Sequence, residues 1–306
     1  MFRHIEENSR YNGPVMRTIL RPRFATLTSD LAHLFGNHGD AWGVTLCIVT
    51  LCLALHAALT PAHLRLAIAL TVIAWLAFAL NDYWDSSYDA RDAAKARGNF
   101  FVVHATPRPV AFAVAAGLVA ILGLELLPFG ALGLAGLAIC IVGMWAYSAP
   151  PLHFKRRPGL DLLTHAAFVQ TGPYLTTLLL IRARWTVTDL ALLAIFVLSS
   201  AAAQLEQQLR DFEVDSQTDL NSTIRIGQAR AVLLLRSITA VVGAIILVGL
   251  VAGIFPAFTL PFAAIAMPAV LHRFLRRQTP RSERLIVLSV LVAAGYATVL
   301  WGWALR

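Results

Sequence analysis

The sequence is poor in charged residues and in cysteine. Only 14% of its 306 residues are Asp, Glu, Lys or Arg, whereas soluble domains usually carry about a quarter. Hydrophobic residues make up 58%, and the mean hydropathy is +0.68. A water-soluble globule of this length cannot bury so many apolar side chains, and a disordered chain would carry few of them. The three cysteines, Cys47, Cys52 and Cys140, lie in apolar runs, which argues against a disulfide scaffold.

The low charge, the high hydrophobicity and the few cysteines together indicate an all-α, polytopic membrane protein. A helix needs about 20 mostly apolar residues to cross the hydrocarbon core. Nine stretches meet this need, near 41–60, 62–81, 109–127, 129–147, 161–181, 188–207, 231–254, 256–272 and 285–304. Residues 16–35 mix arginines with apolar side chains, as a helix lying on the membrane surface does. We therefore expect a cytoplasmic or interfacial segment over 1–40, and a domain of nine transmembrane helices around a central cavity over 41–306.

The basic residues predict how the chain is oriented. Lys and Arg prefer the cytoplasmic side of a membrane. With the N-terminus in the cytoplasm, most of the 25 basic residues face inwards, and the outer side receives Arg65, Arg182, Arg184 and Arg306. Topology thus explains the net charge of +8, and we expect no nucleic-acid partner. We predict a protein of the cell (inner) membrane whose cap loops, near 82–108, 148–160 and 208–230, face the cytoplasm.

More than half of the 17 acidic residues gather in two clusters at these loops. The first cluster, after the second span, holds Asp82, Asp85, Asp89 and Asp92; the second, after the sixth span, holds Glu206, Asp211, Glu213, Asp215 and Asp219. Within each cluster the aspartates stand three or four residues apart, on one face of a helix, where like charges repel. Two such faces at equivalent helix ends indicate a bound cation. Oxygen ligands without cysteine suit Mg²⁺, which commonly shares its ligand shell with phosphates, so we expect a diphosphorylated ligand.

Basic side chains near the two clusters are placed to contact the remaining phosphate charge. They are Lys95, Arg97, Lys155, Arg156, Arg157 and Arg210. The alternative is that they only mark the cytoplasmic side. Asp219 fits either an extra ligand acting through water or a solvated helix face, and Arg236 could reach either the headgroups or the site.

The clusters also carry a resemblance to a known family. Asn81-Asp82-Tyr83-Trp84-Asp85-Ser86-Ser87-Tyr88-Asp89 resembles the first aspartate motif, NDxxDxxxD, of the UbiA superfamily of intramembrane prenyltransferases. Asp211-Phe-Glu-Val-Asp215 resembles the second, DxxxD, and Tyr147-Ser-Ala-Pro-Pro151 with Lys155 resembles the loop between helices four and five. The resemblance covers about residues 41–304. The chain departs from the family around the diphosphate cap: it reads Lys95-Ala-Arg97-Gly98 where many members carry Arg-Pro-Leu/Ile, and Asp219 where many carry Gly.

The resemblance implies Mg²⁺-dependent transfer of an isoprenyl group from a prenyl diphosphate to a hydrophobic acceptor, lipid-like, carotenoid-like or aromatic, inside the lipid bilayer. It implies catalytic, metal-binding roles for Asp82, Asp85 and Asp89 at one Mg²⁺ and for Asp211 and Asp215 at the other. The substrate-binding residues that it implies are Asn81, Lys95, Arg97, Tyr147, Lys155 and Arg210.

Three other functions compete with transfer. A UbiA-type terpene cyclase would ionise the same diphosphate without an acceptor, and the sequence leaves this open. A secondary transporter would place ionisable residues at mid-bilayer beside broken helices, whereas these carboxylates stand at the ends of spans. A CDP-alcohol phosphotransferase also uses helical aspartates and Mg²⁺, but its Asp-Gly…Ala-Arg run is missing from this sequence.

Overall fold

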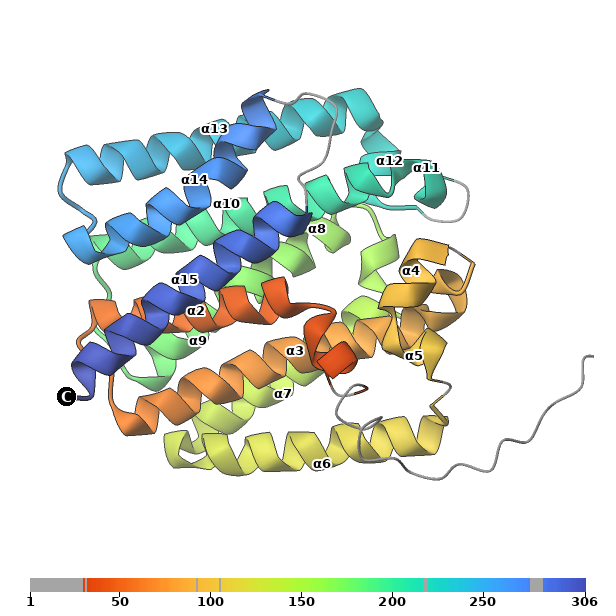
Figure 1. Ribbon diagram of the computed structural model, residues 1–306, viewed down its shortest axis with the longest axis horizontal. Coiled ribbons are helices and arrows are strands. Elements are labelled where there is room, and N and C mark those ends of the chain that lie inside the picture. Colours follow the sequence, from red (N-terminus) through yellow and green to blue (C-terminus); the bar gives the residue numbers. More distant parts are fainter. Residues whose placement is uncertain (1–29, 31, 92, 105, 217–219, 276–282) are drawn as a thin grey trace, which may run out of the picture.

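The computed structural model describes residues 30–306 apart from 31, 92, 105, 217–219 and 276–282, and at 93, 94, 214, 215, 275 and 283 it describes the backbone alone. Every regular element in this part is a helix, and the long helices form a bundle (Figure 1). In chain order the helices are α2 (Gly39–Leu55), α3 (Pro61–Asp89), α4 (Ala93–Gly98), α5 (Phe100–Val103), α6 (Arg108–Leu126), η1 (Leu127–Phe129), α7 (Gly130–Ser148), η2 (Phe154–Arg156), α8 (Leu160–His165), η3 (Ala166–Thr171), α9 (Gly172–Leu180), α10 (Val187–Arg210), α11 (Phe212–Asp215), α12 (Ser222–Ile226), α13 (Gln228–Val251), η4 (Ala257–Thr259), α14 (Leu260–Leu275) and α15 (Glu283–Ala304). The short helices α4, α5, α11 and α12 gather at one end of the bundle, which we name the cap end.

Helices cover each of the predicted spans, and among the described residues six stretches are long and apolar enough to cross a membrane. These stretches are Pro61–Asp89, Arg108–Ser148, Val187–Arg210, Gln228–Val251, Ala257–Phe274 and Arg284–Ala304. Arg108–Ser148 holds two helices, because the chain turns at η1 into Gly130, whose φ of +66° suits a residue without a side chain. The predicted span 161–181 is divided among α8, the π-helical turn η3 and α9. The all-helical membrane class is confirmed; nine crossings and a cytoplasmic N-terminus stay predictions.

The outer surface of the bundle is apolar. Val114 and Leu124 on α6 are 67% and 69% exposed, and Val251 at the end of α13 is 82% exposed. Monomeric soluble proteins rarely expose so much contiguous apolar surface. Such a surface is stable in contact with lipid rather than water, and the chain is therefore an integral membrane protein.

Helix α2 lies between the two main clusters of buried side chains. Its Val49 and Leu53 pack with α3, α6 and α7, and its Ile48 and Cys52 pack with α9, α10 and α13. Both sides of α2 are therefore covered by protein. In a bilayer such packing stabilises mainly through van der Waals contact, because lipid tails are as apolar as leucine.

The end of the bundle opposite the cap is held by a buried carboxylate. Asp189 accepts hydrogen bonds from the Tyr174 hydroxyl at 2.6 Å and from the Thr186 backbone at 2.7 Å, and its Oδ1 lies 3.0 Å from His56 Nε2. Thr186 and Asp189 form a capping box that begins α10. This end therefore joins α2, α9 and α10, and leaves the cap end to be described as the candidate site.

Candidate active site

The first aspartate motif forms the last turns of α3. Because this helix runs unbroken from Pro61 to Asp89, the carboxylates of Asp82, Asp85 and Asp89 lie on one face, as predicted. Asp82 is 8% exposed, and the other two are half-buried. Carboxylates in such a position need hydrogen-bond donors or cations around them.

Asp82 obtains its donors from the segment that precedes α2. Asn37 Nδ2 donates to Asp82 Oδ2 at 2.7 Å, and His38 Nε2 lies 2.9 Å from Asp82 Oδ1. Burial lowers the pKa of His38, but its hydrogen bond to Asp82 and the charge of that residue outweigh burial and raise the pKa above the usual 6.5. Sequence reasoning missed both residues, because no periodic pattern connects residues 37 and 38 to the motif. The predicted surface helix over 16–35 lies outside the described residues except for its last part, where 32–35 is helical.

Asp85 shares Lys155 with Asn81. Lys155, from η2 in the loop after α7, donates to Asn81 Oδ1 at 2.9 Å and also contacts the carboxylate of Asp85. Asn81 Nδ2 donates to Asp85 Oδ2 at 3.0 Å, and the Ser148 hydroxyl donates to Asn81 Oδ1 at 3.1 Å. The loop resembling that between helices four and five is thus joined to the first motif through a cation that is only 13% exposed.

The chain after α3 connects the first motif to the second. Asn99 Nδ2 donates to Asp89 Oδ2 at 2.8 Å, and Asn99 Oδ1 caps α5. Lys95 of α4 donates to Asp211 Oδ2 at 3.2 Å, at the point where α10 ends. Lys95 therefore links the helix after the first motif to the start of the second motif, at the end of the bundle where Figure 1 shows both α4 and α11.

A buried polar network supports the chain that follows the second motif. Asp161 of α8 is fully buried and accepts from Ser222 N and from Gln208 Nε2, both at 2.7 Å. Gln208 Oε1 accepts from the Thr223 hydroxyl at 2.9 Å. The network fixes the start of α12 against α8 and α10. Asp161 was absent from the predicted site because its sequence position is that of an ordinary residue at the start of a span.

The other predicted site residues lie around this centre. The Tyr147 hydroxyl accepts from Gln204 Nε2 at 3.2 Å, whereas Arg97 and Arg210 are exposed. Arg156 stacks over the Tyr88 ring at 4.2 Å, on the edge of the motif. Asp215 ends α11, but its side chain lies outside what the structure describes, as do Asp92 and Asp219. Arg236 donates to the Phe274 carbonyl at 3.3 Å and so joins α13 to α14.

The oxygen donors at the cap end suit a hard cation that also takes oxygen ligands from water or from a bound phosphate. Among the described residues no three or more His, Cys, Asp or Glu side chains are grouped so that they could hold a metal by themselves. Mg²⁺ needs only one or two carboxylates, since water and phosphate oxygens complete its shell. Asp85 and Asp211, which face Lys155 and Lys95, meet that requirement without any cysteine nearby.

Comparison with known proteins agrees with this geometry. The UbiA prenyltransferase family matches residues 41–293, and no curated protein sequence matches the chain. A UbiA homolog from Archaeoglobus fulgidus bound to GPP and Mg²⁺ is similar in structure, with a TM-score of 0.70 and 16% identity over 89% of this chain and 99% of that one. The apo structure of a UbiA homolog from Aeropyrum pernix K1 gives a TM-score of 0.63 and 18% identity over 86% and 96% of the two chains. At these identities the structural likeness shows the fold alone.

Proposed function

The chain belongs to the UbiA prenyltransferase family, and from that premise we propose that it transfers an isoprenyl group from a prenyl diphosphate to a hydrophobic acceptor within the membrane. The observations that carry the proposal are the contact of Lys95, on the helix after the first motif, with Asp211 of the second, and the pairing of Lys155 with Asn81 and Asp85 of the first. The Archaeoglobus fulgidus homologs bind GPP or DMAPP with Mg²⁺, which supports a prenyl diphosphate donor here.

In this proposal each motif holds one Mg²⁺, and the two ions bind the diphosphate. Asp82, Asp85 and Asp89 would hold one Mg²⁺, and Asp211 and Asp215 the other. Bound Mg²⁺ supplies Lewis-acid stabilisation of the charge that develops on a departing diphosphate. Lys95 and Lys155 supply cations to the phosphate oxygens; each faces a carboxylate, so each is already directed at the anionic centre. Exposed Arg97 and Arg210 add positive charge at the rim.

The proposed reaction breaks the bond between C1 of the isoprenyl group and the diphosphate oxygen, and the electron pair leaves with the diphosphate. A nucleophilic atom of the acceptor forms the new bond to C1 and releases a proton. The allylic cation must be kept from water, which a site at the end of a lipid-covered bundle favours. A terpene cyclase would break the same bond, but an alkene of the same chain would take the place of the acceptor.

The cap end faces the cytoplasm in this proposal. It carries Lys95, Arg97, Lys155, Arg156 and Arg157, whereas the opposite end carries few basic residues. Because cytoplasmic loops are enriched in Lys and Arg, this distribution supports a cytoplasmic active site in a protein of the cell (inner) membrane.

Incorporation of radiolabelled GPP into lipid-soluble products tests the function. The full chain, purified and placed in nanodiscs, is incubated with labelled GPP and Mg²⁺, with and without an acceptor-containing membrane extract, and the products are identified by mass spectrometry. We expect a labelled conjugate only with the extract, its loss in EDTA, and its return on adding Mg²⁺. Cyclised hydrocarbon formed without extract would support the cyclase instead, and intact GPP under all conditions would contradict both.

A further inference from the structure

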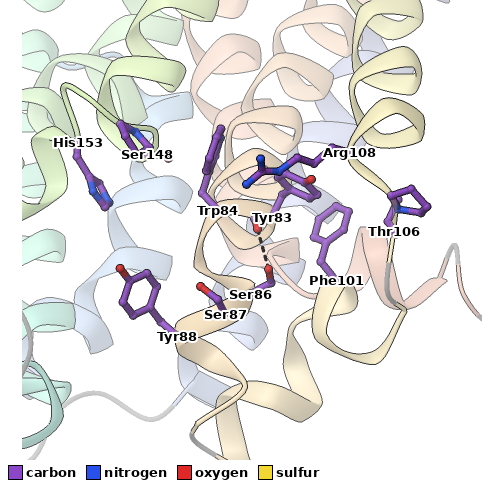
Figure 2. A pocket seen from close by; sticks show the side chains of 12 residues that line it. Tyr83, Trp84, Ser86, Ser87, Tyr88, Phe101, Thr106, Arg108, Ser148 and His153 are labelled. Atoms are coloured by element: carbon purple, nitrogen blue, oxygen red, sulfur yellow. Dashed lines mark hydrogen bonds between the residues drawn. The ribbon is translucent and has the colours of Figure 1, made fainter. Parts of the chain in front are cut away.

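The end of α3 presents two chemically different faces. One carries the three aspartates of the first motif, and the other lines a cavity of about 610 Å³ between α3, α5, the start of α6 and the loop after α7 (Figure 2). None of the residues that line this cavity is Asp or Glu. The cavity therefore offers no carboxylate to Mg²⁺. The aspartates of the first motif lie on the other face of α3.

Arg108 is the cation of this cavity. It is exposed, and none of the described residues accepts a hydrogen bond or forms an ion pair with it. Figure 2 shows its side chain extending from the start of α6 towards Tyr83. Two of the nearby hydroxyls already donate within the protein, Ser86 to the Tyr83 carbonyl at 2.9 Å and Ser148 to Asn81 Oδ1. The guanidinium is thus a positively charged group that remains open to a ligand, and it favours an anion.

Aromatic rings form the wall beside Arg108. The Tyr83 ring lies edge-on to Phe101 at 5.3 Å and to Trp84 at 6.0 Å. Aromatic side chains at the ends of spans typically lie at the level of the lipid headgroups. Phe112, one turn along α6 from Arg108, lies 6.2 Å from the Tyr83 ring and is 46% exposed, so apolar surface adjoins the cavity on this side of α6. A ligand that fits has a negative headgroup and an apolar tail.

We propose that this cavity binds an anionic phospholipid, with its phosphate at Arg108 and an acyl chain along Phe112. The site is distinct from the aspartate face and does not depend on the proposed transfer activity. Ser148 lines the cavity and also donates to Asn81, so the bound lipid lies one side chain away from the first motif.

Quenching of Trp84 fluorescence by brominated lipids tests the proposal on the full chain in nanodiscs. The Trp84 signal is the difference between the wild-type protein and Trp84→Phe. We expect brominated phosphatidylglycerol to quench this signal and brominated phosphatidylcholine to leave it. Arg108→Gln should weaken the phosphatidylglycerol effect roughly tenfold, because a charge-assisted contact is lost. Arg230→Gln is the matched control, since Arg230 is an exposed arginine in the first turn of α13 that does not line the cavity.

Each variant is first checked for its thermal unfolding in the same nanodiscs, so that loss of binding is separated from loss of fold. Equal quenching by both lipids, or an Arg108→Gln protein that behaves as Arg230→Gln does, would overturn the proposal. Displacement of the brominated lipid by inorganic phosphate would also overturn it, because the occupant would then be a free anion. The readout is binding without turnover, so its outcome is independent of the transferase assay.

Discussion

The two aspartate motifs end at the same place but are held in different ways. Each carboxylate of the first motif has a partner from another element: Asn37 and His38 for Asp82, Lys155 for Asp85 and Asn99 for Asp89. In the second motif, Asp211 is 25% exposed and faces Lys95, which is itself 36% exposed. The carboxylates of Asp85 and Asp211 are exposed to similar extents, 22% and 25%, so the difference lies in their cations: Lys155 is 13% exposed and Lys95 36%. We therefore expect the contacts of the first motif to be the more rigid of the two.

Asp85→Asn should have the largest effect on transfer. It removes the charge at the centre of the first motif while keeping the shape of the side chain, so we expect kcat to fall at least about 10³-fold with the fold intact. Initial rates with labelled GPP measure kcat, and thermal unfolding shows whether the fold is intact. Glu213→Gln changes an exposed acid inside the second motif that is neither of its two aspartates, and it should leave the rate unchanged. A rate within tenfold of the wild type for Asp85→Asn would remove this residue from the mechanism.

Asp211→Asn should cost about 10²-fold in kcat/KM and raise the Mg²⁺ concentration needed for half-maximal rate, because the proposal makes Asp211 a Mg²⁺ ligand and its partner Lys95 is the more exposed of the two lysines. A titration of the rate against Mg²⁺ measures this change. An Mg²⁺ requirement equal to that of the wild type would contradict the distinction between the motifs.

Replacing the lysine that contacts the first motif should cost more activity than replacing the lysine that contacts the second. Lys155→Met removes a cation that is 13% exposed and joins Asn81 to Asp85, so we expect about a 10²-fold loss in kcat/KM. Lys95→Met removes the more exposed cation and should cost about tenfold. Arg157 was also expected near the phosphates, but it is exposed and donates to the Pro151 carbonyl at 3.1 Å; Arg157→Gln is therefore the control and should cost nothing measurable. Equal losses for the two lysines would show that burial does not set their importance.

Asp161→Asn should act on stability near the second motif. The Oδ2 atom of this fully buried carboxylate accepts from Ser222 N and Gln208 Nε2, and Oδ1 accepts from the Ser222 hydroxyl. An amide nitrogen in place of either oxygen cannot accept, so it leaves buried donors unpaired. We expect a loss of about 2 kcal/mol in the free energy of unfolding. Denaturant titration in detergent measures the loss, and hydrogen exchange should show faster exchange at α12 than at α5. Uniform destabilisation of both short helices would contradict a local role.

Asn37→Ala should have the smallest effect. Asp82 keeps His38 as a partner, so the loss of one hydrogen bond should lower kcat/KM only a few-fold. The same rate assay measures it. A loss as large as that of Asp85→Asn would mean that the segment before α2 contributes directly to catalysis.

The sequence predicted the parts of the site that follow from periodicity and left out those that depend on long-range packing. Spacing alone placed Asp82, Asp85 and Asp89 on one helix face, because α3 continues through the motif. Asn37 lies 45 residues from Asp82, and Asp161 lies 61 residues from Ser222. Isolated polar residues at such separations carry no periodic pattern, so only the folded bundle brings them together.

The role of Asp215 and the chamber predicted between the motifs stay predictions. The side chain of Asp215 lies outside the described part. The cavity lined by Tyr83 and Arg108, and a second one lined by Gly143 and Phe168, have none of the motif aspartates in their walls. The sequence carries the motif, but the shape of the space between two helix ends depends on side-chain packing that no motif specifies.

Binding of an unreactive thiolo-diphosphate analogue of GPP tests most directly whether both motifs hold one diphosphate. Its Kd is measured by calorimetry, with and without Mg²⁺, for the wild type, Asp85→Asn, Asp211→Asn and the double variant. We predict Mg²⁺-dependent binding that each substitution weakens at least about tenfold, and a double variant weakened by less than the product of the two losses, because the residues share one ligand. Binding that ignores Mg²⁺ and both substitutions would contradict a shared diphosphate site.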